Sequence, residues 1–317
     1  MQTIDPNTTG VELPSLDLLQ KFDVPAPRYT SYPTADRFSK AFSAQDYEQA
    51  LAGRDQNKPL SLYVHIPFCN DICFYCGCNK VVTRDHSKSS EYLDVLGREI
   101  ELVKGKIPGN TTVSQLHFGG GSPTFLNNEE IERVMALITE HFPLEQGGVL
   151  AKVGLNRMSC GVQDFNPDVQ KAVNRIQPFE MTRDTMLAAR EAGFHSINMD
   201  LIYGLPKQSR KSFEKTLDQV LELSPDRIAL YHYAHLPHIF PPQRRILNAD
   251  LPSTLEKVNI MMDAITRLTQ NGYRYIGMDH FAKTTDELAI AQKEGKLQRN
   301  FQGYSTRPEC DMVAFGV

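Results

Sequence analysis

The chain has 317 residues, of which 41% are hydrophobic and 23% are charged. This composition is sufficient for a folded core and excludes a chain that is disordered throughout. The 34 Lys and Arg residues nearly balance the 38 Asp and Glu residues, and the net charge of -4 argues against nucleic-acid binding. No apolar run approaches the roughly 18 residues that a membrane span needs, and the N-terminus has no signal-peptide pattern. We therefore expect a cytoplasmic protein without a membrane span.

Residues 1–58 are polar and contain an aromatic patch, PRYTSYPTA, at residues 27–35. Its prolines exclude a helix, so this patch is predicted to be extended, and residues 1–58 are predicted to form an N-terminal arm packed on the main body. No internal repeat, low-complexity tract or glycine-serine linker divides the remainder. Residues 59–317 are therefore predicted to form one core domain.

Short apolar runs of β-forming residues alternate with amphipathic helical stretches after residue 58. This alternation is typical of a parallel sheet or barrel with crossover helices. The predicted strands are Leu62–Ile66, Val113–Phe118, Met158–Val162, Ile197–Tyr203, Ile228–Tyr233 and Arg274–Met278.

The stretch Glu129–Phe142 is the best-defined predicted helix. Asn127 or Asn128 can cap its N-terminus, and acidic residues follow in its first turn. Its apolar residues recur at helical spacing and form one stripe, which we expect to face the core.

The junction between this helix and the strand at Met158 does not fit the alternation. Residues 149–153 could form a strand, but only Gly154–Asn156 would then separate it from the next strand. A parallel crossover needs a dozen or more residues. The segment is better explained as a helix remnant, and the sequence predicts that part of the pattern is missing here.

Cys69, Cys73 and Cys76 follow the first predicted strand with the spacing C-x3-C-x2-C, and Cys78 lies two residues further on. Clustering of this kind indicates a metal site instead of disulfides. Three thiolates on one loop can hold a cuboidal iron–sulfur cluster and leave one iron free to bind a small molecule, which favours a catalytic cluster. A zinc site stays an alternative, although structural zinc sites usually pair two C-x2-4-C arms across a longer stretch.

Other unusual residues also follow predicted strands, where barrels of this kind carry their chemistry. The GGG run at residues 119–121 lacks side chains that would keep a ligand from the backbone, although a simple strand-to-helix turn explains it too. Pro123 follows and G-x-G-x-x-G is absent, which argues against NAD. Asp279 and His280 are expected in the loop after the last predicted strand.

Asp200 interrupts the apolar run INMDLIYG. A carboxylate in such a run needs a partner or a ligand to offset its desolvation. A structural salt bridge explains it as well as a ligand does.

The spacing C-x3-C-x2-C is the signature of radical S-adenosylmethionine (SAM) enzymes. Together with PRYTSYPTA, YVHIPFC, CGCNK, HFGGGSPT, GVQDFN, DLIYGLP, YAHLP and GMDHFA, it makes the chain resemble oxygen-independent coproporphyrinogen III oxidase from about Phe22 to the last residue. The related haem chaperones share YVHIPFC and GGGSP. They typically lack the arm and the cysteine at the position of Cys78, so both features favour the oxidase.

The resemblance implies a radical SAM oxidoreductase of haem biosynthesis. Such an enzyme converts two propionates of coproporphyrinogen III to vinyl groups and gives protoporphyrinogen IX. Its cofactors would be a [4Fe-4S] cluster and SAM, with room for two SAM molecules. Its partners would be the porphyrinogen substrate and an external one-electron donor, and we expect a monomer.

The resemblance also assigns site residues. The cluster ligands would be Cys69, Cys73 and Cys76. The residues that help to hold the cluster-bound SAM would be Tyr63, Gly120 and Ala234. Those that line the adjoining SAM site would be Tyr75, Gly121, Ser122, Gln163, Arg175 and Asp200. Arg28 and Tyr29 of the arm would contact substrate carboxylates, and Cys78 would act near the reacting centre.

The segment after HFPLEQGG departs from the family pattern. It lacks a strand of the type EIDP or EVDP and most of the following helix, which agrees with the short junction at residues 149–156. We therefore expect an α/β fold, a partial (β/α)6 TIM-like radical SAM barrel with one strand–helix unit missing and without the family's C-terminal helical domain. Two alternatives stay open, a haem-binding, chaperone-like protein and an inactive cluster-binding remnant.

Overall fold

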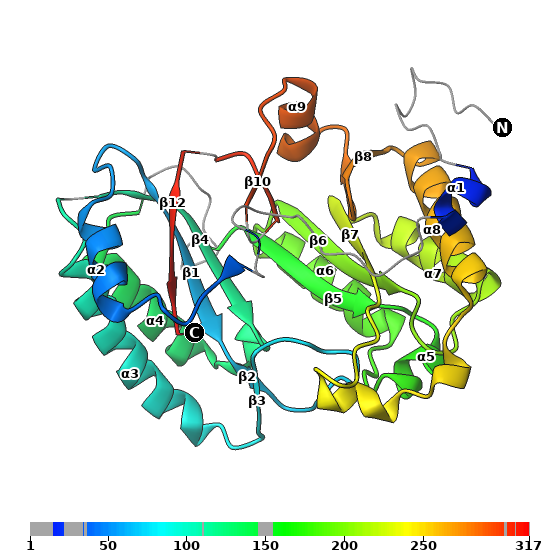
Figure 1. Cartoon of the computed structure of the whole chain (residues 1–317), viewed down its shortest axis with the longest axis horizontal. Coiled ribbons are helices and arrows are strands. Elements are labelled where there is room, and N and C mark those ends of the chain that lie inside the picture. The colour runs from blue at the N-terminus through cyan, green and yellow to red at the C-terminus, as the bar shows by residue number, and fades with distance from the viewer. Residues whose placement is uncertain are drawn as a thin grey trace. The chain divides into compact units, whose positions relative to one another are not determined.

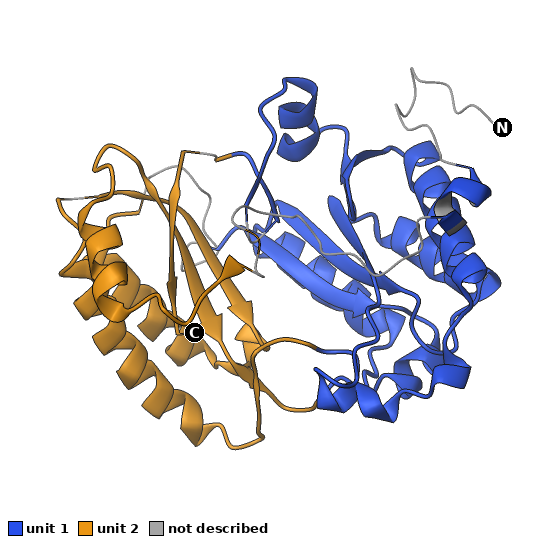
Figure 2. Cartoon of the chain, in the orientation of Figure 1, with its two compact units in different colours: residues 1–28, 73–76, 149–306 blue, residues 29–72, 77–148, 307–317 orange. Residues whose placement is uncertain are grey.

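A computed structural model describes residues 15–21, 34, 37–109, 111–144, 155–300, 303–307 and 309–316. They form an α/β fold, in agreement with the predicted class. Two compact units are present: unit 1 contains residues 1–28, 73–76 and 149–306, and unit 2 contains residues 29–72, 77–148 and 307–317 (Figure 1, Figure 2). Each is described by itself below. Arg28 and Tyr29 of the predicted arm, and the segment 149–153, lie outside the described residues.

Unit 2 contains a parallel sheet in the order β12 (Asp311–Phe315), β1 (Leu60–Ile66) and β4 (Val113–Gly120). The central strand β1 is buried at every position but one. A strand buried in this way is typical of a parallel sheet that is covered on both faces. β1 continues into β2 (Phe68–Cys69), which pairs with β3 (Val81–Val82). The sheet thereby positions the first cysteine of the motif.

The described helices of unit 2 are α2 (Ala44–Ala52), α3 (Ser87–Lys104), α4 (Asn128–His141) and the short 3-10 helix η2 (Pro123–Phe125). α4 confirms the helix predicted over 129–142. Asn127 accepts from the backbone N–H of Glu130, and the Glu130 side chain accepts from the backbone N–H of Asn127. This capping box satisfies two backbone donors at the start of the helix. Val134 and Ile138 of the predicted apolar stripe are buried in one core with α3 and β1.

Unit 1 contains a mixed sheet in the order β5 (Arg157–Gln163), β6 (Ser196–Tyr203), β7 (Arg227–His232), β9 (His280–Lys283) and β8 (Tyr273–Gly277). β5, β6 and β7 are parallel, whereas β9 is antiparallel to both β7 and β8. On β6, Ile197, Met199 and Leu201 are fully buried, and the alternating residues Asn198 and Asp200 lie on the opposite face. The sheet therefore has one apolar face and one polar face.

The long helices of unit 1 are α6 (Phe179–Glu191), α7 (Arg210–Leu223) and α8 (Thr254–Gln270), and they share one buried apolar cluster with β6 and β7. The other described elements of this unit are α1 (Leu16–Lys21), α5 (Pro167–Ala172), η3 (Pro241–Arg245), η4 (Asn248–Asp250), α9 (Glu287–Lys293), β10 (Gln298–Asn300) and β11 (Gly303–Ser305). In the described part of the chain, every helix is too short or too polar to cross a membrane.

The six predicted strands are confirmed as β1, β4, β5, β6, β7 and β8, each within two residues of its predicted ends. The placement of His280 in a loop is wrong, because His280 begins β9. A tight turn through Gly277 and Met278, both with positive φ, folds β9 back along β8. β9 therefore lies between β7 and β8 in the sheet, so β8 pairs with β9 and is not a parallel neighbour of β7. The edge strand β12 was not predicted.

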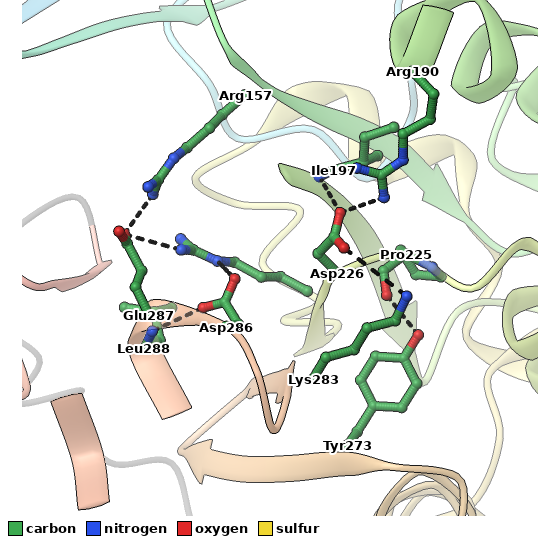
Figure 3. A network of polar contacts seen from close by, with 11 residues as sticks. Arg157, Arg190, Ile197, Pro225, Asp226, Tyr273, Lys283, Asp286, Glu287 and Leu288 are labelled. Atoms are coloured by element: carbon green, nitrogen blue, oxygen red, sulfur yellow. Dashed lines mark hydrogen bonds and ion pairs between the residues drawn. The ribbon is translucent and has the colours of Figure 1, made fainter. Parts of the chain in front are cut away.

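An ion-pair network joins the first residues of β5 and β7 to the N-terminus of α9 (Figure 3). Glu287 accepts from Arg157 at 2.5 Å and from Arg227 at 3.1 Å, and Asp286 accepts from Arg227 at 2.8 Å. Asp286 also caps α9 by accepting from the backbone N–H of Leu288 at 2.8 Å. The hydrogen bond from Arg157 is the main cause that lowers the pKa of Glu287 to about 2, and Arg227 adds to it. The network fixes α9 against two strands.

Asp226 is the centre of a second set of hydrogen bonds and ion pairs nearby (Figure 3). Its carboxylate accepts from the Arg190 side chain and from the backbone N–H of Ile197 at 2.8 Å, and Lys283 lies 3.9 Å away. The Tyr273 hydroxyl donates to the carbonyl that precedes Asp226, at 2.6 Å. These contacts tie α6 and four strands of unit 1 together.

We predict that Glu287→Gln lowers the free energy of unfolding by about 1 kcal/mol at pH 7, which allows for solvent screening of this partly exposed pair. A carboxylate whose pKa falls from 4.5 to about 2 on folding stabilises the folded state above about pH 4.5. That contribution is lost as the pH falls toward 2. Urea unfolding of wild type and variant should therefore differ less than half as much at pH 3 as at pH 7.

Glu214→Gln is the matched control. Glu214 forms an exposed ion pair with Arg267 at 3.2 Å in the same unit, and such pairs contribute about 0–1 kcal/mol. We expect this variant to change unfolding little at either pH. An effect of Glu287→Gln that is equal at pH 7 and pH 3 would contradict the role given to the network.

Candidate functional site

The cysteine-loop residues 73–76 are anchored within unit 1 by backbone and side-chain contacts. The backbone N–H of Phe74 donates to the carbonyl of Val173 at 2.9 Å, at the end of α5. The Gln243 side-chain amide donates to the carbonyl of Tyr75 at 3.1 Å. The backbone N–H of Cys76 donates to the carbonyl of Cys73 at 3.2 Å, which closes a turn. The loop is thus held from two sides.

Arg175 connects this loop to β5. Its Nε donates to the carbonyl of Gly161 at 3.0 Å, a second guanidinium nitrogen donates to the same carbonyl, and Nη1 lies 3.7 Å from the sulfur of Cys73. Burial raises the pKa of Tyr75, and the positive charge of Arg175 acts in the opposite direction. The structure therefore places Cys73, Tyr75 and Arg175 together.

Gln163, at the end of β5, has an unusual backbone and a buried acceptor without a partner. Its φ is 67°, in the left-handed region that costs a non-glycine residue free energy. Its Oε1 is buried and has no hydrogen-bond partner among the described residues. A Cβ on Gly161 would lie 2.9 Å from Gln163 Nε2, so the glycine makes room for this side chain. A buried acceptor of this kind can be satisfied by a ligand donor.

Asp164 fixes the turn on which Gln163 lies. It is 1% exposed and accepts from Thr216 Oγ1 at 2.6 Å, from Gln208 Nε2 at 2.6 Å and from the backbone N–H of Asn166 at 2.7 Å. Burial raises the pKa of Asp164, and these hydrogen bonds act against that rise. Asp164 was not predicted as a site residue, although an acidic residue directly after Gln163 in the motif GVQDFN was a visible signal.

Asp200 lies on the polar face of β6. It accepts from Ser159 Oγ at 2.9 Å and from Asn198 Nδ2 at 2.7 Å. Burial raises the pKa of Asp200, and these two hydrogen bonds and the positive charge of Arg175 lower it. No ion pair of Asp200 is present among the described residues, so its environment is a set of neutral donors with a nearby cation.

Ala234 is placed by a residue that the sequence analysis missed. Gln243, which is 2% exposed, donates to the carbonyl of Ala234 at 3.2 Å as well as to Tyr75, and its Oε1 accepts from the backbone N–H of Leu236 at 2.6 Å. One buried amide therefore fixes the segment after β7 and the cysteine loop together. Nothing in the local sequence PPQRR marks this role.

In unit 2, His65 links Tyr63 to the segment that follows Cys78. The Tyr63 hydroxyl lies 3.0 Å from His65 Nδ1, and His65 Nε2 lies 3.0 Å from the carbonyl of Asn79. A carbonyl only accepts, so His65 Nε2 donates to Asn79. Burial raises the pKa of Tyr63, and the charge of Cys78 acts in the same direction. His65 was not predicted, although its place inside an apolar strand was a signal.

The GGG run packs directly against β1 and the first cysteine. A Cβ would lie 2.7 Å from the Tyr63 ring at Gly119, 2.7 Å from the carbonyl of Ile66 at Gly120, and 2.9 Å from the sulfur of Cys69 at Gly121. Gly120 also has φ 109°. The glycines are therefore required by close packing on the cysteine segment, whether or not a ligand approaches them.

Ser122 follows this run and lies beside the first cysteine. Its backbone N–H donates to the carbonyl of Phe68 at 2.8 Å, and its hydroxyl lies 3.9 Å from the sulfur of Cys69. Unit 2 thus brings together the predicted residues Tyr63, Cys69, Gly120, Gly121 and Ser122, and unit 1 brings together another set. That set comprises Cys73, Tyr75, Cys76, Gln163, Arg175, Asp200 and Ala234.

The donor groups fit a cluster and SAM. Cys69, Cys73 and Cys76 are not in disulfides and are partly buried, and Cys78 is exposed. The described residues contain no group of three His, Cys, Asp or Glu side chains that could hold a single metal ion. This does not argue against a cluster, because each thiolate binds a different iron of the cube and the three sulfurs need not surround one point. The unpaired acceptor of Gln163 suits a ligand with amino and hydroxyl donors, as SAM has.

Comparison with known proteins agrees with this geometry. The profile of the Radical SAM superfamily matches residues 63–220, which contain the cysteine motif and the GGG run. The oxygen-independent coproporphyrinogen III oxidase of Escherichia coli (strain K12) is 50% identical over 319 residues, which cover 95% of this chain and 69% of that protein. The chain belongs to the oxygen-independent coproporphyrinogen III oxidase family.

Other members of this oxidase family match over similar spans. The Pseudomonas aeruginosa protein is 50% identical over 323 residues, with 95% of this chain and 70% of that protein covered. The Helicobacter pylori (strain J99) protein is 40% identical over 338 residues, with 100% and 72% covered. A solved structure of coproporphyrinogen III oxidase from Escherichia coli, described as a radical SAM enzyme, matches with a TM-score of 0.88 at 49% identity, and covers 95% of this chain and 71% of that one. The fold is therefore the radical SAM α/β fold.

We predict that Gly121→Ala lowers cluster loading. The new Cβ would lie 2.5 Å from the carbonyl of Phe68 and 2.9 Å from the sulfur of Cys69, so the cysteine segment must shift. Overpacking of this kind costs about 1–3 kcal/mol. Iron and sulfide per chain after anaerobic reconstitution should fall, and urea unfolding should occur at lower urea.

Gly97→Ala is the matched control in the same unit. A Cβ there meets only the flexible side chain of Leu137, at 3.3 Å, and alanine favours the helix α3. We expect cluster loading like that of the wild type. Equal loading of Gly121→Ala and wild type would show that close packing against Cys69 does not matter for the cluster.

Proposed function

We propose that this chain carries out the reaction for which its relatives are named, the oxygen-independent oxidation of coproporphyrinogen III. The decisive observation is the setting of Cys73. Its thiol lies beside Arg175, which is fixed on the carbonyl of Gly161. The side-chain amide of Gln163, whose Oε1 has no partner among the described residues, has its Nε2 next to the same glycine. A thiolate ligand and a polar cofactor site are thereby adjacent.

The cluster and SAM, when bound, supply an electron and the means to remove a hydrogen atom from an unreactive C–H bond. Each reacting propionate then loses one hydrogen atom from its β-carbon, carbon dioxide and one further electron, and a vinyl group remains. Two such rounds give protoporphyrinogen IX. The chain's own residues bind, orient and shield the cofactors, which carry the difficult bond chemistry. An external one-electron donor is required because reductive cleavage of SAM consumes an electron.

Cys69, Cys73 and Cys76 act as the cluster ligands in this proposal. Three ligands within eight residues suit one cluster, and their thiols are not engaged in disulfides. Arg175 Nη1 lies 3.7 Å from the sulfur of Cys73. Cys78, exposed and close enough to Tyr63 to affect its pKa, acts near the reacting centre.

The SAM-binding residues fall into two groups. Tyr63, Gly120 and Ala234 hold the SAM bound to the cluster, and His65 and Gln243 orient two of them by the hydrogen bonds described above. The adjoining site is lined by Tyr75, Gly121, Ser122, Gln163, Arg175 and Asp200. Arg28 and Tyr29, which lie outside the described residues, contact substrate carboxylates.

We also propose that one strand–helix unit of the family's barrel is missing between β4 and β5. Two observations support this: among the described residues β4 is the last strand in the order of the unit 2 sheet, and an isolated parallel bridge joins Val113 to Leu144. The alignment to the Helicobacter pylori relative has 338 positions against a chain of 317 residues, so at least 21 positions of that relative have no counterpart here. This number suits one strand and most of a helix.

The haem-binding alternative is not favoured, because the relatives that match most of the chain are named as oxidases. A cluster-binding remnant without activity is the second outcome of the experiment below. Action as a monomer in the cytoplasm stays an expectation from the sequence.

Anaerobic reconstitution followed by addition of SAM, dithionite and coproporphyrinogen III tests the proposal. We predict that the wild-type chain forms 5′-deoxyadenosine and a vinyl product, both measured by mass spectrometry. Cys73→Ser should lose cluster iron and reduce both products to background, because the thiolate ligand is gone. A wild-type chain that carries the cluster but forms neither product would contradict the proposal.

Cys160→Ser is the control. Cys160 lies on β5 outside the motif, and burial raises the pKa of its thiol to about 11, so it stays protonated at neutral pH. We expect cluster loading and product formation as in the wild type. A loss as large as that of Cys73→Ser would place the cluster elsewhere.

A further inference from the structure

Arg299, on β10 of unit 1, carries buried donors that nothing in the described chain uses. Its Nε and Nη1 are buried without a hydrogen-bond partner, and no ion pair of Arg299 is present among the described residues. Arg157 and Arg227 of the same unit, in contrast, both pair with carboxylates. A guanidinium stays charged in a protein, and unpaired buried donors next to a charge are costly. Such donors in a native site call for a partner from outside the chain.

The guanidinium of Arg299 is held in place by an aromatic ring. Its central carbon lies 4.7 Å from the centre of the Tyr304 ring, on the paired strand β11. Tyr304 is fixed in turn. Its ring packs edge-on to the ring of His280, with 5.2 Å between the ring centres. Its hydroxyl lies so close to Gly277 that a Cβ on this glycine would clash with it. A cation–π contact uses the face of the guanidinium and leaves the N–H groups in its plane free. The guanidinium is therefore oriented by the ring, and the ring does not use its in-plane donors.

This cluster lies on the polar face of the unit 1 sheet. His280 pairs in register with Ala229, and Ala229 pairs with Asp200. Directly paired residues on neighbouring strands point to the same face. The His280 ring that packs on Tyr304 thus shares a face with Asp200, one of the residues assigned above to SAM.

We propose that Arg299 binds a carboxylate of the porphyrinogen substrate through its free N–H groups. Guanidinium N–H groups donate strong, charge-assisted hydrogen bonds to carboxylate oxygens in the plane of the group, and the compact ammonium of lysine does not reproduce this planar arrangement. The inference rests on the proposed function, because coproporphyrinogen III presents a propionate on each of its rings while SAM presents a single carboxylate. Tyr304 acts as a positioning residue for the guanidinium.

The test measures binding of coproporphyrin III and of its tetramethyl ester to the anaerobically reconstituted full chain, by the emission of the porphyrin. In wild type we expect the acid to bind more tightly than the ester. Arg299→Gln should weaken binding of the acid about tenfold to a hundredfold, the effect of one lost charge-assisted pair, and leave binding of the ester unchanged. Arg299→Lys should fall between the two. Arg183→Gln, which removes an exposed arginine on α6, should bind like the wild type.

The ratio of the two dissociation constants within one variant does not depend on how much of the protein is folded, so a destabilised variant still gives an answer. An acid-to-ester ratio that is the same in Arg299→Gln and wild type would overturn the inference. So would a loss of SAM binding in the absence of porphyrin with unchanged porphyrin binding, because the carboxylate would then be that of SAM.

Failure of the proposed function has a different signature. A wild-type chain that forms no 5′-deoxyadenosine but still prefers the acid through Arg299 would count against the reaction and support the carboxylate site. If the wild-type chain forms the vinyl product and Arg299→Gln keeps the same preference for the acid over the ester, the result would count against the carboxylate site alone.

Discussion

The contact between Arg175, the carbonyl of Gly161 and the sulfur of Cys73 is the interaction on which the proposed site depends. It joins the end of a core strand to a cysteine loop that has little regular structure of its own. Gln243 adds a second anchor from the segment after β7. A loop held by buried hydrogen bonds of this kind keeps its thiols at fixed positions, and preorganised ligands of this kind are what a catalytic cluster requires.

The sequence predicts much of this architecture because burial leaves a pattern that can be read locally. The strands at 62–66 and 197–203 are apolar where they face a core, and α4 has both its cap and its stripe in the sequence. The cysteine spacing is equally local, since all three thiols lie on one short loop. The GGG run was also visible in the sequence, where close approach of a ligand or a simple turn could explain it. Only the structure reveals that the glycines are required by packing against β1.

The elements and residues that were missed depend on partners that are distant in sequence. β9 is short and mixed in composition, and it exists because a turn at Gly277 returns the chain beside β7. β12 gains its burial from β1, some 250 residues earlier. Gln243 and Arg299 owe their roles to what surrounds them after folding. Gln243 donates to two backbone carbonyls, whereas Arg299 has buried donors that stay unpaired among the described residues. Neither has a motif that a sequence can display.

Mössbauer spectroscopy of the anaerobically reconstituted chain, with and without SAM, tests the central claim most directly, namely that three thiolates hold an iron–sulfur cube with one iron open to SAM. We predict about four irons and four sulfides per chain, with one iron whose signal changes when SAM is added while the other three stay the same. A cluster in which all irons are unaffected by SAM, or protein that retains no iron after reconstitution, would contradict the account.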